Sequence, residues 1–433
     1  MCGIAGEIRF DDQPVRPDRV QSMMRRQASR GPDAEGFESF GWAALGHRRL
    51  KIVDLSDRAA QPMKNEETGR CIVFNGCIYN HDELRDELRG LGHRFFSLSD
   101  TEVILRAFNE WGADCVERLN GMFAFAILDS HAEAIFMARD RLGIKPLYLL
   151  ETGNALLFAS YLPALIEHAE ASPDIDRNAL HHYMTFHSVV PAPRTILQSV
   201  RKLPPATWRI IRRNGETKSR VYWEPHHRRT ADDDDDSLEA WRERVHLKLN
   251  QAVRRRLTGD VPVGVLLSGG LDSSLIVGLL AENGQKGLNT FSVGFESAGD
   301  EQGDEFEYSD LVADHFGTDH HQIRVDSGEL MSHLPDCFNA MSEPMVSHDN
   351  IGFYLLSREV SRHVKVVQSG QGADEVFAGY HWYPPLMDSS DVLDDYRRVF
   401  FDRDHDEFCR AVDERYVNGD ASTAFVRDYF EKA

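Results

Sequence analysis

Apolar runs in the second half of the chain alternate with segments of helical character. The run 261–267 leads through a short polar turn into a second apolar run, 275–280. A buried parallel strand followed by a tight turn and a helix accounts for this order. The alternation then repeats, which predicts a parallel, doubly wound sheet. The further strands expected are 290–295, 318–325 and 364–367, and the helices expected are 241–257, 309–316 and 353–363.

The first half and the junction contain shorter elements and one highly charged stretch. A strand at 72–74 runs into the Asn-Gly pair 75–76, and a helix is expected over 100–111. Five consecutive aspartates, 232–236, repel one another and stay solvated, which predicts a linker or exposed loop. We therefore divide the chain into a first domain with its junction, an acidic linker and a second domain, at residues 2–225, 226–239 and 240–433.

Length, charge and cysteine spacing narrow the class of protein. A chain of 433 residues is long enough for more than one domain, each with its own core. The net charge of −21 repels polyphosphate backbones, which argues against nucleic acid as a partner. The six cysteines form no CxxC pair, which argues against a zinc site or a disulfide framework and fits a reducing compartment. No apolar run reaches membrane-spanning length, so we expect a cytoplasmic protein without a membrane partner.

Candidate chemistry lies in the turn after the first of these strands, SGGLDSS at 268–274. The adjacent Gly269 and Gly270 let the backbone bend and leave N–H groups pointing into the turn. These groups, the helix N-terminus and the serine hydroxyls predict an anion-binding site. Asp272 is expected to hold a divalent cation shared with bound phosphates. The competing interpretation is an ordinary Gly-Ser turn, and the spacing and lysine of a Walker loop are absent.

The N-terminus offers a second candidate. Cys2 and Gly3 are small enough for Met1 to be removed, which would leave a thiol and a free α-amine on one residue. An α-amine has a pKa of about 7.7–8.0 and can act as the base for its own side chain. A buried structural cysteine is the alternative, and position alone does not decide between the two.

Later segments of the first half contain groups that can serve this thiol. Arg49 can hold a carboxylate with its guanidinium fork, or form a surface ion pair. The Asn75 amide and the Gly76 N–H can form an oxyanion hole, or a hairpin turn. Asp100 lies near a helix start, where its alternative role is that of an N-cap. A Gly-Pro pair marks a further turn at 29–33.

Taken in this order, these segments resemble the class II glutamine amidotransferase domain, the N-terminal-nucleophile (Ntn) type. The likeness covers 2–163 and includes GMFAFAILD at 121–129 and ARDRLGIKPLY at 138–148. It implies an αββα sandwich that hydrolyses L-glutamine to glutamate and ammonia. The resemblance makes Cys2 the nucleophile, Arg49 the partner of the glutamine carboxylate and Asp100 the partner of its ammonium. The implied oxyanion stabilisers are Asn75 and Gly76, and the implied glutamine-binding residues are Arg49, Val53, Asn75, Gly76, Cys77 and Asp100.

One position departs from the amidotransferase pattern. Most relatives read Asn-Gly-Glu, whereas this chain has Cys77 after Asn75 and Gly76. A neutral thiol does not replace a carboxylate beside the ammonium of glutamine. We therefore expect weaker glutamine binding, with Asp100 carrying more of the interaction.

The second half resembles the synthetase domain of the asparagine synthetase family. The likeness rests on SGGLDSS, which is similar to the pyrophosphate loop of ATP pyrophosphatases, together with SGQGADEVFAGY at 369–380. It implies that ATP adenylates a carboxylate and that Asp272 and Asp374 hold Mg²⁺. A helix cap is the alternative for Asp374 and Glu375. Gln371 replaces an acid found in many relatives, and an amide cannot act as a general base. The implied ATP-binding residues are Leu266, Ser268, Gly269, Gly270, Asp272, Ser273, Ser274, Val293, Ser369, Gly370, Gln371, Asp374 and Glu375.

Four longer motifs resemble the N-acetylglutaminylglutamine amidotransferase branch of this family. That branch forms the amide of an acetylated glutamine dipeptide, a compatible solute. Aspartate as the acceptor, as in asparagine synthetase, is the first alternative, and a non-catalytic nucleotide-binding regulatory protein is the second. The expected partners are L-glutamine, ATP and a small carboxylate acceptor, and the sequence also permits a homodimer. The motifs are NGCIYN at 75–80, HHYMTFHSVVPAPRTI at 181–196, EPMVSHDNIGFYLLS at 343–357 and QSGQGADEVFAGYHWYPP at 368–385.

Two further features of the sequence raise expectations about the junction and the end. Adjacent histidines at 181 and 182, and a third at 187, suggest a metal site. Neighbouring positions point to different helix faces and no carboxylate completes a ligand set, so a metal is not expected here. Synthetase relatives continue beyond the position of Ala433, so we expect the chain to be truncated or its acceptor site to be completed differently.

Overall fold

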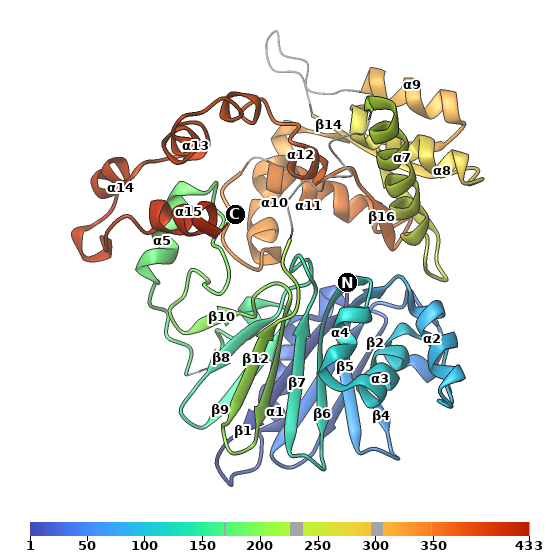
Figure 1. Cartoon of the computed structure of the whole chain (residues 1–433), viewed down its shortest axis with the longest axis vertical. Coiled ribbons are helices and arrows are strands. Elements are labelled where there is room, and N and C mark those ends of the chain that lie inside the picture. Colours follow the sequence, from blue (N-terminus) through green and yellow to red (C-terminus); the bar gives the residue numbers. More distant parts are fainter. Residues whose placement is uncertain (169, 226–236, 296–305, 348, 433) are drawn as a thin grey trace. The chain divides into compact units, whose positions relative to one another are not determined.

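The computed structural model of the chain describes residues 1–168, 170–225, 237–295, 306–347 and 349–432 (Figure 1). These residues divide into two units. The first unit comprises Met1–His226 and His405–Ser422, and the second comprises His227–Asp404 and Thr423–Ala433. Most of the acidic linker expected at 226–239 lies outside the described residues. Its last residues belong to helix α7 (Leu238–Arg255), whose N-cap is Ser237.

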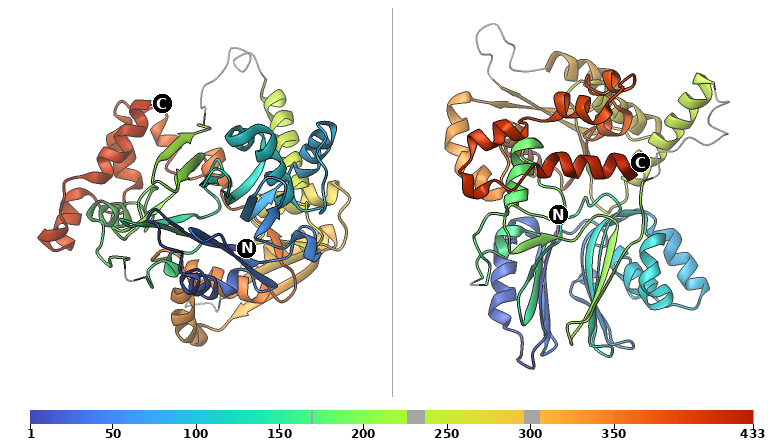
Figure 2. Two further views of the ribbon diagram at one scale, coloured as in Figure 1. Left: turned by 90° about the horizontal axis from the view of Figure 1, so that it is seen from below. Right: turned by 60° about the vertical axis from the view of Figure 1, so that its left-hand side comes forward.

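Two six-stranded antiparallel sheets form most of the first unit, and the right-hand view of Figure 2 shows them face to face. Helix α1 (Pro17–Arg26) covers the outer face of one sheet, and α2 (His81–Gly90) and α3 (Asp100–Trp111) cover the other. The αββα sandwich implied by the sequence resemblance is therefore confirmed. In spatial order, the first sheet contains β10 (Val200–Lys202), β8 (Tyr148–Glu151), β9 (Ala155–Ala159), β1 (Gly3–Arg9), β3 (Ala43–Arg49) and β2 (Ala34–Ser39). The second contains β12 (Thr217–Val221), β11 (Thr207–Arg212), β7 (Ala134–Arg139), β6 (Gly121–Asp129), β5 (Arg70–Ile78) and β4 (Met63–Asn65).

Alternate side chains of a strand enter different cores of the sandwich. In β5, Val73 packs in the core between the two sheets, whereas Ile72 and Phe74 pack in the core beneath α2 and α3. Because both faces of the strand are covered, its sequence reads as a continuous apolar run rather than an alternation. Burying one such large apolar side chain contributes about 1.5–3 kcal/mol. The two cores therefore fix which face of β5 each side chain occupies.

The second unit is built on a four-stranded parallel sheet. Its strand order is β15-β14-β13-β16, and every pair of neighbouring strands is parallel. The strands and the helices between them appear in the alternating order that the apolar pattern predicts. The strands are β13 (Val263–Leu266), β14 (Asn289–Phe295), β15 (Asp319–Val325) and β16 (Val366–Gln368). The helices between them are α8 (Leu271–Glu282), α9 (Phe306–Phe316), α10 (Ser327–Ala340) and α11 (Asp349–Val360).

Apolar cores on both faces of this sheet confirm the doubly wound arrangement. On one face, Val265 packs with Val277 of α8 and Ala313 of α9. On the other, Phe291 of β14 packs with Leu356 and Val360 of α11. Both faces of a parallel sheet need such cover, because its strands are apolar on both sides.

The remaining helices lie after the parallel sheet in the sequence or belong to the first unit. Helices α5 (Arg177–Thr185) and α14 (His405–Ala411) both belong to the first unit, although they are far apart in the sequence. The loop after β16 leads into the short helix α12 (Ala373–Phe377). The others are α4 (Cys115–Arg118), α13 (Val392–Phe400) and α15 (Ala421–Lys432).

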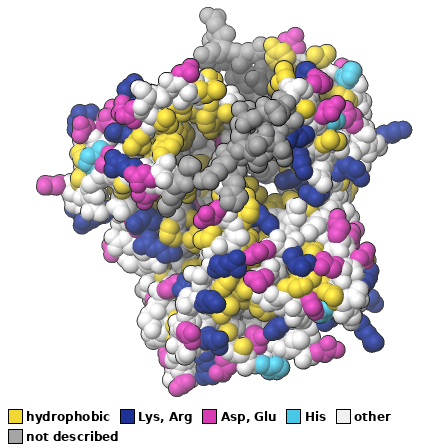
Figure 3. All heavy atoms as spheres, viewed as in Figure 1, with side chains coloured by type: hydrophobic (Ala, Val, Ile, Leu, Met, Phe, Trp, Pro, Cys, Tyr) yellow, Lys and Arg dark blue, Asp and Glu magenta, His cyan; other side chains and the backbone are white. Residues whose placement is uncertain are grey.

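Charged side chains of both signs intermingle on the face of the first unit seen in Figure 3. On that face the acidic excess of the sequence does not form a patch of one sign. Among the described helices, none combines the length and the apolar character needed to cross a bilayer.

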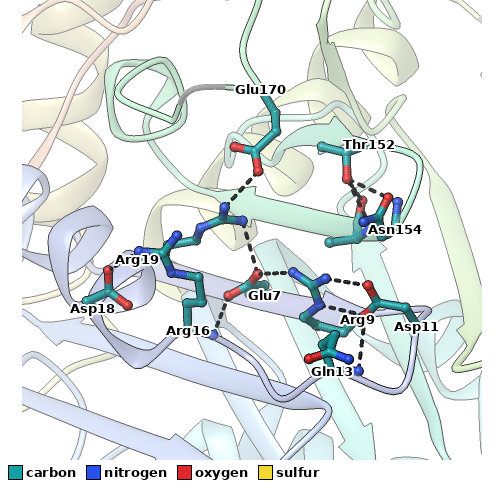
Figure 4. A network of polar contacts seen from close by, with 11 residues as sticks. Glu7, Arg9, Asp11, Gln13, Arg16, Asp18, Arg19, Thr152, Asn154 and Glu170 are labelled. Atoms are coloured by element: carbon teal, nitrogen blue, oxygen red, sulfur yellow. Dashed lines mark hydrogen bonds and ion pairs between the residues drawn. The ribbon is translucent and has the colours of Figure 1, made fainter.

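A buried acid joins α1 to the first sheet (Figure 4). Glu7 of β1 is fully buried and accepts a hydrogen bond from the backbone N–H of Arg16 at 3.0 Å. Its carboxylate also lies 3.3 Å from Arg19 Nη1 and 3.7 Å from Arg9 Nη1. Arg9 extends the network to Asp11. A buried carboxylate is tolerated because these donors replace its lost hydration.

We predict that Glu7→Gln lowers the stability of the first unit by about 3 kcal/mol, because it removes the buried charge of an ion pair and leaves Arg9 and Arg19 only their outer partners, Asp11 and Glu170. Urea unfolding followed by circular dichroism measures the change. Glu87→Gln is the matched control, since Glu87 and Arg118 form an exposed pair and its loss is expected to cost less than about 1 kcal/mol. Equal losses in the two variants would contradict this account of Glu7.

Candidate functional site

Cys2 lies directly before β1, beside the end of β3. Gly3 pairs with Arg48, and the backbone N–H of Leu50 donates to Cys2 Sγ at 3.4 Å. Arg30 Nε donates to the backbone oxygen of Cys2 at 3.2 Å. Burial raises the pKa of the Cys2 thiol, while the Leu50 hydrogen bond and the nearby N-terminal amine lower it. A base is therefore needed to generate the thiolate in this environment.

The chain begins with Met1 in this structure, and its α-amine is buried. The pKa of this amine is lowered to about 6, chiefly by burial and to a smaller extent by the nearby cations Arg30 and Lys145, while the charge of Cys2 acts in the opposite direction. Lys145 is itself buried, and its Nζ lies 3.1 Å from Met1 Sδ. The surroundings of this end of the chain therefore favour a neutral amine at neutral pH, which is the form that can accept a proton.

Asn75 and Gly76 lie inside strand β5, so the hairpin-turn interpretation of this pair is wrong. The pair continues an antiparallel ladder, with Gly76 opposite Phe123. A Cβ on Gly76 would approach the backbone oxygen of Met122 to 2.2 Å, so only glycine fits. Tertiary pairing with β6 overrides the turn propensity of the dipeptide.

The side chain of Asn75 is buried and points toward the start of β1. Its Nδ2 lies 3.5 Å from Ser160 Oγ, which accepts a hydrogen bond from the backbone N–H of Ile4 at 3.1 Å. The Oδ1 atom of Asn75 is buried without a hydrogen-bond partner. Ser160, which the sequence analysis did not single out, thus connects Asn75 to the segment that carries Cys2.

Arg49 ends β3 and is only 4% exposed, so the surface ion-pair interpretation is wrong. Its Nη1 donates to the backbone oxygen of Ser56 at 2.9 Å, and its Nη2 donates to that of Asp54. The Asp54 carboxylate accepts from the backbone N–H of Leu98 at 2.8 Å and holds this loop in place. Val53, which is half-buried, lies in the same loop. The loop therefore orients the guanidinium and leaves it further N–H donors for a ligand.

Asp100 is the first residue of α3, and the N-cap is Ser99, whose Oγ accepts from the N–H of Glu102. The N-cap interpretation of Asp100 is therefore wrong. Its carboxylate is 4% exposed and accepts from the backbone N–H of Ile78, the last residue of β5, at 3.0 Å. Burial raises the pKa of Asp100. The Asp100 charge raises the pKa of the Cys2 thiol and the Arg49 charge lowers it, so both side chains interact electrostatically with the thiol.

Cys77 is buried, and its charge state acts on the pKa of Lys145. The pKa of Lys145 is lowered to about 8, chiefly by burial and to a smaller extent by the Arg30 cation. Neither Lys145 nor Arg30 was assigned a role from the sequence alone. Both lie in motifs noted above, the Arg-Gly-Pro turn and ARDRLGIKPLY, and a basic side chain inside such a motif is the signal that could have found them.

His47 of β3 links the two sheets behind the candidate site. Its ring is fully buried and Nε2 lies 3.2 Å from the backbone oxygen of Phe74. Because a carbonyl only accepts, Nε2 carries the proton that is donated. Burial lowers the pKa of His47 to about 3, so the ring is neutral in the folded protein at neutral pH. This bond fixes β3, which carries Arg49, against β5, which carries Asn75.

The second candidate site is the loop between β13 and α8. Ser273 Oγ accepts from the backbone N–H of Ser268 at 3.3 Å, and Ser268 Oγ accepts from that of Gly270 at 3.3 Å. Gly269 has a φ of +86°, and a Cβ there would lie 2.5 Å from Tyr308. Ser274 Oγ is buried without a hydrogen-bond partner. The loop thus combines an internally braced turn with an unpaired hydroxyl at a helix start.

The motif after β16 lies against this loop, because β13 and β16 are neighbouring parallel strands. A Cβ on Gly370 would approach the Cβ of Asp272 to 2.7 Å. Ser369 Oγ accepts from the backbone N–H of Gln371 at 3.2 Å. The carboxyl ends of parallel strands therefore bring the two motifs together at one edge of the sheet, where α/β proteins bind ligands. Leu266 and Val293 lie on the two central strands, β13 and β14, partly buried against the core beneath α11.

The acids of α12 are not its N-cap. That position is Gly372, in a left-handed conformation, so the capping interpretation of Asp374 and Glu375 is wrong. Asp374 Oδ1 lies so close to Gly379 that a Cβ on this glycine would approach it to 2.1 Å. Glu375 accepts a hydrogen bond from the Tyr380 hydroxyl at 3.0 Å.

One premise of the sequence analysis about the junction histidines is wrong. No carboxylate was expected near them, yet Asp420 Oδ1 lies 3.8 Å from His181 Nε2. The acid comes from a segment that is distant in sequence, which a local ligand search could not find.

Comparison with known proteins places both halves in recognised families. Residues 1–223 match the family model described as a glutamine amidotransferase domain, and residues 244–431 match the one described as asparagine synthase. The glutamine-hydrolysing asparagine synthetase 3 of Bacillus subtilis is 33% identical over 397 residues, which are 88% of this chain and 64% of that protein.

Two further relatives are also named as glutamine-hydrolysing asparagine synthetases. The glutamine-hydrolysing asparagine synthetase 1 of B. subtilis is 34% identical over 388 residues, covering 88% of this chain and 59% of that protein. A putative glutamine-hydrolysing asparagine synthetase 2 of Methanocaldococcus jannaschii is 33% identical over 462 residues, covering 99% of this chain and 84% of that protein. This chain therefore spans less than two thirds of the length of the two Bacillus proteins.

The buried neutral His47 predicts a loss of stability in acid. Its pKa rises from about 3 in the folded state to 6.5 in the unfolded state, so the unfolded chain binds a proton that the folded chain excludes. The neutral His47 ring contributes fully to the free energy of unfolding above pH 6.5. This contribution is lost as the pH falls, and the free energy of unfolding decreases by about 2 kcal/mol between pH 7 and pH 5.

His47→Gln retains a donor for the Phe74 carbonyl but cannot take up a proton in this range. Its stability should fall by about 2 kcal/mol less than that of the parent between pH 7 and pH 5, as measured by urea unfolding at each pH. Identical pH dependence in the two chains would show that His47 is not the group responsible.

Proposed function

This chain belongs to the family of glutamine-hydrolysing asparagine synthetases, and we propose that it transfers ammonia from L-glutamine to a carboxylate activated by ATP. The Cys2 thiol attacks the amide carbon of glutamine and releases ammonia, and water cleaves the resulting thioester to glutamate. The acceptor carboxylate attacks the α-phosphate of ATP to give an acyl-adenylate and pyrophosphate. Ammonia then displaces AMP and forms the amide.

The observation that carries the glutaminase half is the electrostatic interaction of the half-buried Cys2 thiol with two buried charged side chains, Arg49 and Asp100. We propose that removal of Met1 gives Cys2 its own amine as base. The Asn75 amide and the Gly76 N–H then stabilise the tetrahedral oxyanion. Arg49 binds the glutamine carboxylate and Asp100 its ammonium, with Val53 and Cys77 completing the pocket.

The nucleotide half of the proposal rests on the paired loops at the edge of the parallel sheet. The N-terminus of α8 and the unpaired Ser274 hydroxyl favour an anion. Ser268, Gly269, Gly270 and Ser273 surround the pyrophosphate in this proposal. The other residues proposed to contact ATP are Leu266, Val293, Ser369, Gly370, Gln371 and Glu375.

Magnesium fits the oxygen donors of this edge. Asp272 lies in the first turn of α8, against Gly370 of the loop that leads to Asp374. We propose that these two carboxylates hold Mg²⁺, which when bound neutralises charge on the polyphosphate. In the same proposal the glutaminase activity belongs to the domain at 2–225 and the synthetase activity to the domain at 240–433. The protein is cytoplasmic in this proposal, which is also compatible with a homodimer.

We propose the acetylated dipeptide N-acetylglutaminylglutamine as the acceptor, in the synthesis of an osmolyte. The support is the resemblance of four motifs, together with the replacement of two acids by Cys77 and Gln371. Aspartate is the second candidate, favoured by the names of the relatives reported above. A non-catalytic regulatory protein is the third candidate.

One assay separates these candidates. The chain is incubated with ATP and either glutamine or ammonium, with N-acetylglutaminylglutamine, aspartate or no acceptor, while AMP, pyrophosphate and product mass are measured. We expect AMP formation that depends on the dipeptide, and a product mass that corresponds to the dipeptide with one carboxyl group converted to a carboxamide. Dependence on aspartate alone would replace the proposed acceptor, and absence of turnover with every acceptor would favour the regulatory alternative.

Cys2→Ala is expected to lower glutamine-dependent synthesis at least about 1,000-fold and to leave ammonium-dependent synthesis intact. Asp272→Asn should lose both. Mass spectrometry of the active chain should find Cys2 as its first residue. Retention of Met1 on fully active protein would contradict the proposed base.

Restoring a carboxylate at position 77 should improve glutamine binding. We predict that Cys77→Glu lowers the glutaminase KM by roughly 5-fold, which corresponds to about 1 kcal/mol for a charge-assisted contact with the ammonium. Cys77→Gln is the matched control, because it has the same shape without the charge. Lys145 interacts electrostatically with position 77 and could therefore pair with the new acid instead of the glutamine ammonium. Equal KM values for the two variants would show that the new acid does not act on glutamine.

A further inference from the structure

Among the described residues, one group of three histidine and acid side chains brings its donor atoms together outside both candidate sites. Atoms of His181, His405 and Asp420 all lie within 4.8 Å of one another. His181 Nε2 is 3.0 Å from His405 Nδ1 and 3.8 Å from Asp420 Oδ1. All three residues belong to the first unit, where α5 and α14 lie side by side (Figure 1).

The spacing of these atoms suits one small divalent ion. Zinc binds imidazole nitrogen and carboxylate oxygen at about 2.0–2.2 Å, which places tetrahedral ligand atoms about 3.3 Å apart. The two short distances measured from His181 Nε2 lie on either side of this value. A small movement of the half-buried Asp420 side chain toward the two imidazoles would therefore complete three ligand positions, with a fourth left for water.

The second nitrogen of each imidazole already has a partner, as is usual for metal-binding histidines. His181 Nδ1 lies 2.6 Å from Ser422 Oγ, and His405 Nε2 lies 3.5 Å from Cys409 Sγ. If both outer nitrogens carry protons and donate them, the lone pairs of His181 Nε2 and His405 Nδ1 face each other. The Ser422 hydroxyl can then donate to His182 Nδ1 at 3.1 Å.

The packing around His181 limits its movement. His181 is 2% exposed, and the centroid of the fully buried Phe408 ring lies 4.4 Å from the centroid of its imidazole. Helix α5 is fixed at its start by Asp176, whose side chain accepts from the N–H of Ala179. The ligand is therefore held on a rigid element before any ion binds.

We propose that His181, His405 and Asp420 bind a divalent ion of the zinc class and that this ion fastens the segment His405–Ser422 to α5. Imidazole donors favour zinc, cobalt, nickel or copper, whereas magnesium prefers a shell of oxygen ligands. The site is thus chemically distinct from the magnesium site proposed at the parallel sheet. Because its ligands come from segments far apart in the sequence, an ion here acts as a cross-link.

The test uses the full chain without a histidine tag, freed of metal by chelation, and Co²⁺ alone as a spectroscopic probe. We expect one equivalent of Co²⁺ to bind with visible d–d absorption, Zn²⁺ to displace it and an excess of Mg²⁺ not to. His181→Ala and Asp420→Asn should each lower Co²⁺ affinity at least about 100-fold, and Ser422→Ala about 10–100-fold. His187→Ala is the control, because His187 is an exposed histidine just beyond α5 and should leave affinity unchanged.

Hydrogen exchange supplies a readout of the cross-link. Zn²⁺ should slow amide exchange in α14 of the parent and the His187→Ala variant, and not in Asp420→Asn. Circular dichroism of each metal-free variant establishes that it is folded, and Asp420→Asn is a conservative change should His181→Ala not fold. The proposal is overturned if no stoichiometric Co²⁺ binds, which would leave a hydrogen bond between two imidazoles. It is equally overturned if Asp420→Asn binds Co²⁺ as tightly as the parent. A thiolate charge-transfer band that Cys409→Ser removes would also overturn it, because Cys409 would then be a ligand.

Discussion

The candidate amidotransferase site depends on how the two antiparallel sheets pack against each other. One sheet carries Arg49 and, directly before its strand β1, Cys2, and the other carries Asn75 and Gly76. Apolar side chains between the sheets set their separation, and two polar bridges set their alignment. These bridges are the contact of His47 with the Phe74 carbonyl and the contacts of Ser160 with Ile4 and Asn75. A slip of either sheet would separate the thiol from the amide.

Burial at this site has opposite effects on the two groups that matter. It raises the pKa of the Cys2 thiol and lowers that of the N-terminal amine to about 6. Each shift favours the neutral form, because a buried charge loses its hydration. Arg49 and Asp100, one of each sign, are nevertheless kept nearby by backbone hydrogen bonds. The arrangement is suited to a zwitterionic ligand and a proton transfer between neutral partners.

The parallel sheet places its candidate chemistry by a different principle. Two loops meet because their strands, β13 and β16, are parallel neighbours whose carboxyl ends lie at one edge. Gly370 permits this close approach, since a Cβ there would collide with Asp272, and Gly269 lets the first loop lie against Tyr308 of α9. The hydroxyls of Ser268 and Ser273 brace the loop from within, which leaves the helix N-terminus as its outward-facing feature.

The sequence by itself determined the parallel sheet, the strand–turn–helix around Gly269, the helix over 100–111 and the resemblance that implied the sandwich. These features depend on backbone propensity and apolar periodicity, which act over a few residues. Only the tertiary structure decided that Asn75 and Gly76 continue a strand, that Ser99 rather than Asp100 caps α3, and that Asp420 faces His181. Each of these depends on a contact between distant segments, and a local pattern carries no information about which distant segment will pack against it.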